Sequence, residues 1–218
     1  MLDCVMPVAG ASSRMRSRNG SAAFKPLLPF AGSSLVEVSA AAALVAGCRL
    51  LLVAGCRGEE VEAAFASPRY RSLREEGRLL VVGNPRWEEG LLGSIQAGLS
   101  RARGEAVFVA HADMPFVRPE DYAALASARA ATAEADSPRR DESPGAVATA
   151  AAAFFASFGG RRGHPVLLPS AWIPAIAALP PGEGLRSFLL RRPARLVETG
   201  PGALRDIDTL EDYERSLP

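Results

Sequence analysis

Short apolar runs alternate along the chain with segments in which apolar residues recur at helical spacing. Residues 49–54, 79–82 and 106–110 are continuous apolar runs of strand length, and each is expected to form a buried strand. Residues 35–46 and 58–65 are expected to form helices, the first capped by Ser33 or Ser34 and ended by Gly47. This alternation predicts a mostly parallel sheet with helices on both faces.

The second half of the chain continues the pattern after one interruption. Pro119 opens an expected helix that runs toward residue 130, and residues 131–146 lack an apolar period, which predicts a mobile insertion. Too few elements follow to build a second core. Residues 1–218 are therefore expected to form one α/β domain with a doubly wound sheet. Its last elements are strands at 147–158 and 195–198 and helices at 170–179, 184–192 and 210–217.

Composition narrows the class of protein. The chain has 218 residues, 48% of them apolar, and a net charge of +1, so it lacks the basic surface of a general nucleic-acid or membrane binder. No apolar stretch reaches the roughly 18 residues of a membrane span. The three cysteines, Cys4, Cys48 and Cys56, lie in apolar surroundings without zinc-type spacing. We expect a cytoplasmic protein with reduced thiols.

The first candidate for chemistry is the turn after the opening apolar run, within residues 4–16. Gly10 and Ala11 let the backbone approach a ligand, Ser12 and Ser13 offer hydroxyl and amide donors, and Arg14 offers a fork suited to phosphate. The alternative is an ordinary strand-to-helix turn with a serine cap. Lys25 opens an apolar run, either as a surface lysine or aimed back at this cradle.

Two further segments follow expected strands, at the edge where open α/β sheets bind ligands. Residues 84–95 read Asn-Pro-Arg-Trp-Glu-Glu-Gly-Leu-Leu-Gly-Ser-Ile, a loop running into a helix that should start near Ser94 and could accept a nucleoside. Its alternative is a capped helix after a long loop. Asp113 ends a buried strand and is the best metal-ligand candidate, with Mg²⁺ the expected ion; the alternative is a turn aspartate before Pro115.

The remaining candidates lie near the end of the chain. Asp206 and Asp208 flank Ile207 and point the same way if the segment is extended, so one could join Asp113 at a metal and the other cap the last helix. His164 could be a substrate contact, a base or a solvated loop residue. No serine or cysteine nucleophile accompanies it in a recognisable arrangement, so a hydrolase triad is unsupported.

Taken together, these motifs resemble the MobA/MocA-like NTP transferase family, the nucleotidyltransferases of molybdenum cofactor biosynthesis. The resemblance spans nearly the whole chain and is closer to the cytidylyltransferase branch. It rests on residues 8–15, Lys25-Pro26-Leu27-Leu28, the loop 84–94, Asp113-Met114-Pro115, Gly163-His164-Pro165 and Asp206-Ile207-Asp208-Thr209.

The resemblance implies a Rossmann-like nucleotide-diphospho-sugar transferase fold that binds CTP, or GTP, with Mg²⁺. The terminal phosphate of an acceptor such as molybdopterin would attack the α-phosphate and release pyrophosphate, and the protein could dock to a molybdoenzyme or its chaperone. The implied catalytic residues are Arg14, Lys25 and Asp113, and the metal ligands are Asp113, Asp208 and Asp206. Nucleotide contacts would come from Ala9, Gly10, Ala11, Ser12, Ser13, Asn84, Gly90 and Ser94, and acceptor contacts from Gly163 and His164.

Several positions depart from the family pattern and keep other functions open. Pro7 and Val8 stand where the family's opening Leu-Ala-Ala-Gly has leucine and alanine, Arg16 replaces a closing glycine, and His111 stands where an apolar residue or glycine is usual. The alternatives are a sugar-1-phosphate nucleotidyltransferase and a nucleotide-binding protein without transferase activity. A dinucleotide-dependent oxidoreductase would need Gly-x-Gly-x-x-Gly after the first strand, and a phosphate-loop kinase would need Gly-Lys-Ser/Thr; both motifs are missing.

Overall fold

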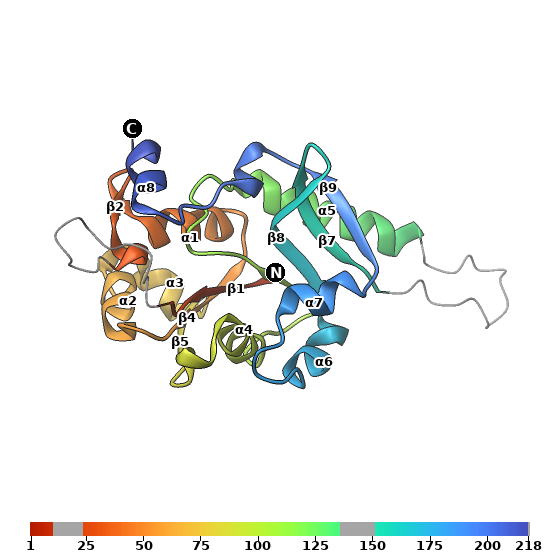
Figure 1. Cartoon of the computed structure of the whole chain (residues 1–218), viewed down its shortest axis with the longest axis horizontal. Coiled ribbons are helices and arrows are strands. Elements are labelled where there is room, and N and C mark those ends of the chain that lie inside the picture. Colours follow the sequence, from red (N-terminus) through yellow and green to blue (C-terminus); the bar gives the residue numbers. More distant parts are fainter. Residues whose placement is uncertain (11–23, 136–150, 218) are drawn as a thin grey trace, which may run out of the picture.

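A seven-stranded sheet organises the molecule (Figure 1). The computed structural model describes residues 1–10, 24–135 and 151–217. The strands lie in the order β5-β4-β1-β6-β8-β7-β9. Their bounds are β1 Asp3–Val8, β4 Arg49–Ala54, β5 Leu79–Gly83, β6 Ala106–Val109, β7 Ala153–Phe158, β8 Arg161–Pro169 and β9 Ala194–Glu198, and β2 (Pro29–Phe30) and β3 (Ser33–Ser34) form a separate small ribbon.

The strand directions confirm the predicted mostly parallel sheet. β5, β4, β1 and β6 are parallel, β8 runs antiparallel to both of its neighbours, and β9 is parallel to β7. After β1 the chain builds β4 and β5 on one side and then returns to place β6 on the other side. The carboxyl ends of β1 and β6 therefore form the switch point at which open α/β sheets bind ligands.

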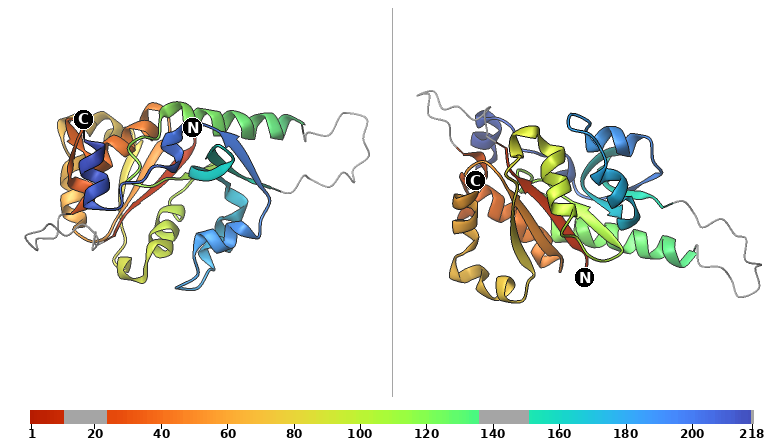
Figure 2. Two further views of the ribbon diagram at one scale, coloured as in Figure 1. Left: turned by 45° about the horizontal axis from the view of Figure 1, so that its top comes forward. Right: turned by 90° about the horizontal axis from the view of Figure 1, so that it is seen from below.

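Helices cover both faces of this sheet (Figures 1 and 2). On one face, α1 (Leu35–Val45), α2 (Gly58–Phe65) and α5 (Pro119–Ala135) pack on the larger core; on the other, α4 (Leu91–Leu99), α6 (Ile173–Ala177) and α7 (Leu185–Leu190) pack on a second core. The short α3 (Arg71–Glu75) and α8 (Leu210–Ser216) lie at the periphery. Both faces of β1 are therefore buried, as the apolar run at residues 4–8 requires.

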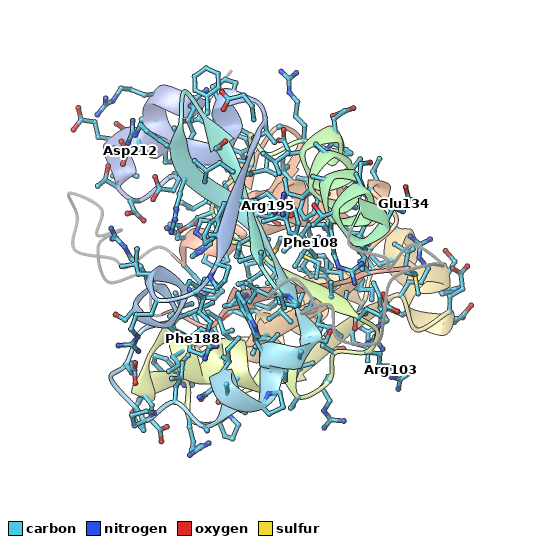
Figure 3. All side chains as sticks on the ribbon, turned by 90° about the vertical axis from the view of Figure 1, so that its right-hand side faces the viewer. Arg103, Phe108, Glu134, Phe188, Arg195 and Asp212 are labelled. Carbon is cyan, nitrogen blue, oxygen red and sulfur yellow. The ribbon has the colours of Figure 1, made fainter. Side chains whose placement is uncertain are left out.

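Alternating side chains of the strands divide between the two cores. Met6 and Phe108 enter the larger core, whereas Val5 faces the second core. Helix α4 approaches β1 closely because Gly98 has no side chain: a Cβ there would lie 2.4 Å from Cγ1 of Val5. Figure 3 shows Phe108 and Phe188 among packed side chains, while Asp212 lies at the edge of the molecule.

Several element boundaries differ from the prediction. Helix α5 continues to Ala135, so the first five residues of the predicted insertion 131–146 are helical; this segment is rich in alanine, the strongest helix former. The rest of that insertion lies outside the described residues. Strand β7 begins at Ala153 rather than at residue 147, and α4 begins at Leu91 rather than near Ser94.

Among the described residues, no helix is both long and apolar enough to cross a membrane.

Candidate active site

A cluster of three charged side chains lies at the carboxyl edge of the sheet. Nζ of Lys25 is 2.6 Å from Oδ2 of Asp113 and 3.3 Å from Oδ1 of Asp208. Lys25 opens the short 3₁₀ helix η1 (Lys25–Leu27), Asp113 follows β6, and Asp208 precedes α8. The fold thus brings together three of the predicted site residues from distant parts of the sequence. We call them the charged cluster.

A buried isoleucine places Asp208 beside Asp113. Ile207 is fully buried against Phe30 and Leu35, and its backbone N–H donates to the carbonyl oxygen of Asp113 at 2.9 Å. Asp206 and Asp208 flank this anchor; Asp206 is exposed and Asp208 is half-buried. The predicted cap of the last helix is supplied by neither aspartate, because Thr209 caps α8 and forms a capping box with Asp212.

The loops after β1, β4 and β5 pack together next to the cluster's strand edge. The backbone N–H of Cys56 donates to the carbonyl of Ala9 at 3.3 Å. A Cβ on Gly55 would lie 2.4 Å from Cβ of Trp87 and 2.8 Å from Cβ of Ala9, so only glycine permits this packing. Gly10 is exposed at the end of β1. The other cradle residues predicted from the sequence, Ala11, Ser12, Ser13 and Arg14, lie outside the described residues.

The predicted nucleoside loop is held by a buried pair of polar side chains. Nδ2 of Asn84 donates to Oγ of Ser94 at 3.0 Å, and the backbone N–H of Arg86 donates to Oδ1 of Asn84 at 3.1 Å. Ser94 has no exposed surface and Asn84 almost none. These two side chains are buried and hydrogen-bonded to each other, so they hold the shape of the loop. We expect any ligand contact of the loop to come from its exposed residues. Gly90, with φ +109°, is one such member and lies just before α4.

A cavity of about 680 Å³ lies next to the switch point of the sheet. Its walls come from the start of α4, the ends of β6 and β8, and α7, and they include Gly90, Gly163 and His164 among the predicted residues. Aliphatic side chains such as Ile95 and Leu189 line much of it, with Arg162 and Arg186 among its charged members. The cavity therefore suits a ligand that carries both apolar and anionic parts.

Two histidines line this cavity in direct contact. The rings of His111 and His164 are 4.1 Å apart between centroids, at 69°. Burial, reinforced by the neighbouring His111, lowers the pKa of His164 to about 3. Burial also lowers the pKa of His111, although the carboxylates of Asp113 and Asp206 act in the opposite direction. Both rings are therefore neutral near pH 7.

His111 is the site residue that sequence reasoning did not place. The sequence marks His111 only as a departure from the family pattern. In the structure it lines the cavity, and the charges of Lys25, Asp113 and Asp208 act on its ring. It thus joins the cavity to the charged cluster. Its position two residues before Asp113, just beyond a strand end, was the available signal.

Gly163 serves the packing of the site. A Cβ at this position would lie 2.1 Å from the carbonyl oxygen of Ala203, in the 3₁₀ helix η5 (Pro201–Leu204). Only glycine lets η5 close against β8 here, and this closure fixes the backbone that carries His164 on the cavity wall. The predicted acceptor contact at Gly163 is compatible with this role because the residue also lines the cavity.

The oxygen donors of the charged cluster fit a magnesium ion. Asp113 and Asp208 direct carboxylate oxygens at one point, now taken by the ammonium of Lys25. Mg²⁺ in nucleotide sites is bound through one or two carboxylates, with waters and phosphates completing its shell. Within residues 1–10, 24–135 and 151–217 no group of three or more histidine, cysteine or acidic side chains forms a closed metal site.

Comparison with known proteins identifies the family. Residues 4–196 match the model of the MobA-like NTP transferase domain. The chain belongs to this family. The predicted resemblance is thereby confirmed.

Two curated relatives of similar length carry names for different activities. The molybdenum cofactor cytidylyltransferase of Escherichia coli is 26% identical over 97% of this chain and 93% of its own. The nicotine blue oxidoreductase of Paenarthrobacter nicotinovorans is 29% identical over 99% of this chain and 98% of its own. Family membership alone therefore does not specify the substrate.

Solved structures confirm the fold of this MobA-like chain. Rv0371c from Mycobacterium tuberculosis superimposes with a TM-score of 0.73 at 21% identity, covering 100% of this chain and 98% of that one. The match covers the whole chain and confirms the α/β fold predicted from the sequence.

Proposed function

We propose that this chain transfers a nucleoside monophosphate from an NTP, with CTP preferred, to a phosphate-bearing acceptor such as molybdopterin. The observation that carries the proposal is the charged cluster at the switch point of the sheet, where Lys25 lies between Asp113 and Asp208. Nucleotidyl transfer needs little covalent help from a protein; it needs reactants in line and charges neutralised. A lysine and two carboxylates at a sheet edge meet that need.

In the proposed reaction, an oxygen of the acceptor phosphate forms a bond to the α-phosphorus. The bond from that phosphorus to the oxygen bridging to the β-phosphate breaks, and pyrophosphate leaves with the bonding electron pair. Lys25 neutralises charge that develops on the α-phosphate. The exposed backbone at Gly10 supplies amide donors to the phosphates, as in other glycine-containing phosphate loops.

Asp113 and Asp208 would hold Mg²⁺, and exposed Asp206 is a second-choice ligand on the same segment. When bound, the ion would supply charge neutralisation at the phosphates. A crystal structure of Rv0371c in complex with manganese shows a divalent cation bound by a protein of this fold. The hard oxygen donors of this chain favour the same class of ion.

The cavity beside His111 is the proposed acceptor site. It opens next to the charged cluster, so an acceptor seated there reaches the cluster through His111. Its aliphatic walls favour an acceptor with a ring system over a simple sugar phosphate, because a sugar needs many hydrogen-bond partners. Arg162 and Arg186 offer positive charge to an acidic group on that acceptor.

Pyrophosphate release tests the proposal. The protein is incubated with Mg²⁺ and each of CTP, GTP, UTP and ATP, together with molybdopterin or with glucose 1-phosphate as the sugar-phosphate probe. We expect release with CTP and molybdopterin. Release only with glucose 1-phosphate would favour the sugar-1-phosphate alternative, and nucleotide binding without release would favour a non-catalytic binding protein.

Two variants control this assay. Asp113→Asn removes one charge of the cluster and should slow release on the order of 10²–10³-fold. Arg129→Met removes a cation that pairs with Glu105 on the molecular surface, so it should release pyrophosphate at the wild-type rate. Because one relative is named nicotine blue oxidoreductase, reduction of that dye by NADH is measured in parallel. Dye reduction without pyrophosphate release would overturn the transferase proposal.

A further inference from the structure

Lys25 is the only lysine in the sequence, although lysine and arginine together number 25. Its ammonium occupies the point on which the carboxylates of Asp113 and Asp208 converge, and its side chain is 15% exposed. An ammonium is a compact point charge, whereas a guanidinium is a broad fork. A lysine can therefore take the position of a small cation in a way that an arginine cannot.

We propose that Lys25 is the resident cation of the Asp113–Asp208 pair in the free protein and exchanges with the divalent ion when the nucleotide binds. This inference rests on the proposed function, since it assigns the cation site to Asp113 and Asp208. In the free protein the ammonium of Lys25 already pairs with both carboxylates. A divalent ion can reach the carboxylates only by displacing the ammonium or by lying close to its positive charge. Because like charges repel, the free protein has low affinity for the ion.

The nucleotide makes the exchange favourable. Its phosphates bring negative charge that can receive the displaced ammonium, and its bound cation can take the carboxylates. Cation and nucleotide therefore enter together, and each raises the affinity for the other, as linkage requires. Without a nucleotide, Lys25 keeps the two carboxylates paired.

The backbone around the cluster needs no rearrangement for this exchange. Phe24 is buried beneath the guanidinium of Arg57, 4.9 Å from its ring centroid, and Pro26 is buried on the other side of Lys25. The loop of Asp113 is fixed by the hydrogen bond from Ile207. Only the flexible four-carbon side chain of Lys25 has to move, and the carboxylates stay in place.

A manganese titration tests the exchange without requiring turnover. Free Mn²⁺ is followed by electron paramagnetic resonance in the absence of nucleotide, for the wild type, Lys25→Met and the control Arg129→Met. We expect Lys25→Met to bind Mn²⁺ roughly tenfold or more tightly than the wild type, because a like charge at contact distance is removed. Arg129→Met should match the wild type. Equal or weaker binding by Lys25→Met, or no binding by either protein, would overturn the proposal.

The same titration with CTP separates this inference from the proposed function. CTP should raise the affinity for Mn²⁺ more in the wild type than in Lys25→Met, because only the wild type gains a freed ammonium for the phosphates. Tighter Mn²⁺ binding by Lys25→Met, with no CTP effect in either protein, would support the resident lysine and count against the nucleotidyltransferase.

Acetylation of the wild type gives a readout that does not depend on a variant. Lys25 carries the only side-chain amine, so acetic anhydride labelling at this position is read directly by peptide mass spectrometry. Saturating Mn²⁺ should increase the labelling rate of Lys25 as the ammonium leaves its carboxylates. An unchanged rate at saturating Mn²⁺ would contradict the exchange.

Discussion

Two charged clusters lie at opposite ends of strand β1 and differ in almost every physical respect. At the amino end, Arg49 and Asp3 form a two-point pair, with Nε–Oδ1 at 2.7 Å and Nη2–Oδ2 at 2.8 Å, and their side chains are 7% and 4% exposed. At the carboxyl edge, Lys25 is shared between Asp113 and Asp208, which are 22% and 45% exposed. The first cluster is a buried one-to-one pair, and in the second one ammonium contacts two partly exposed carboxylates.

The difference separates a structural pair from a ligand site. The buried pair also forms hydrogen bonds to neighbouring backbone groups. Arg49 donates to the carbonyl of Arg101 at 2.8 Å, and the backbone N–H of Arg103 donates to Asp3. A buried pair satisfied in this way resists exchange with any ligand. The charged cluster, by contrast, has partly exposed carboxylates and a point-like cation, so a ligand can reach it.

The largest effect on stability is expected at the buried pair. Asp3→Asn leaves the guanidinium of Arg49 buried without its counter-charge, which costs about 3–5 kcal/mol of unfolding free energy. Urea denaturation measures this loss, and pyrophosphate release per folded molecule should stay at the wild-type level. A loss of activity larger than the loss of folded protein would show that the two clusters are coupled.

A smaller effect of pH is expected from His164 on the cavity wall. Its pKa is about 3 in the folded protein, below the ordinary value of 6.5, so the unfolded chain binds the proton more readily between these pH values. Stability should fall as the pH falls below 6.5, by up to about 2 kcal/mol between pH 7 and pH 5. His164→Asn should remove most of this slope in urea denaturation at the two pH values; an unchanged slope would place its origin elsewhere.

The smallest effect is expected at the loop beside the cluster. Ser94→Ala removes the acceptor of the Asn84 side chain and leaves an amide donor unpaired, which costs about 1 kcal/mol of unfolding free energy, the lower end for such a group. Thermal unfolding measures the loss. A change of more than twofold in the Michaelis constant for CTP in this variant would show that Ser94 contributes directly to nucleotide binding.

Local pattern was enough to predict most of the sheet and several helices. β4 and α2 have the predicted bounds because apolar runs and first-turn acids act locally. The predicted boundaries were wrong where contacts between residues distant in the sequence determine where an element begins. Helix α4 starts earlier than predicted because Gly90 can adopt φ +109° and Ser94 is drawn into a buried bond with Asn84.

The candidate site was predicted in its residue types more than in its geometry. Strand ends predicted that Lys25, Asp113 and Asp208 lie near one edge, but the shared ammonium depends on the bond between Ile207 and Asp113, which no local pattern encodes. The contact between His111 and His164 depends in turn on the antiparallel pairing of β6 with β8.

The most direct test of the central claim is pyrophosphate release from CTP by Asp113→Asn, compared with the wild type under single-turnover conditions. Removing this carboxylate charge should slow release on the order of 10²–10³-fold, the typical loss for one electrostatic group at a transition state. Circular dichroism and the melting temperature should stay close to those of the wild type, because Asp113 is partly exposed and its backbone contact remains. Near wild-type release by a folded Asp113→Asn protein would contradict the account.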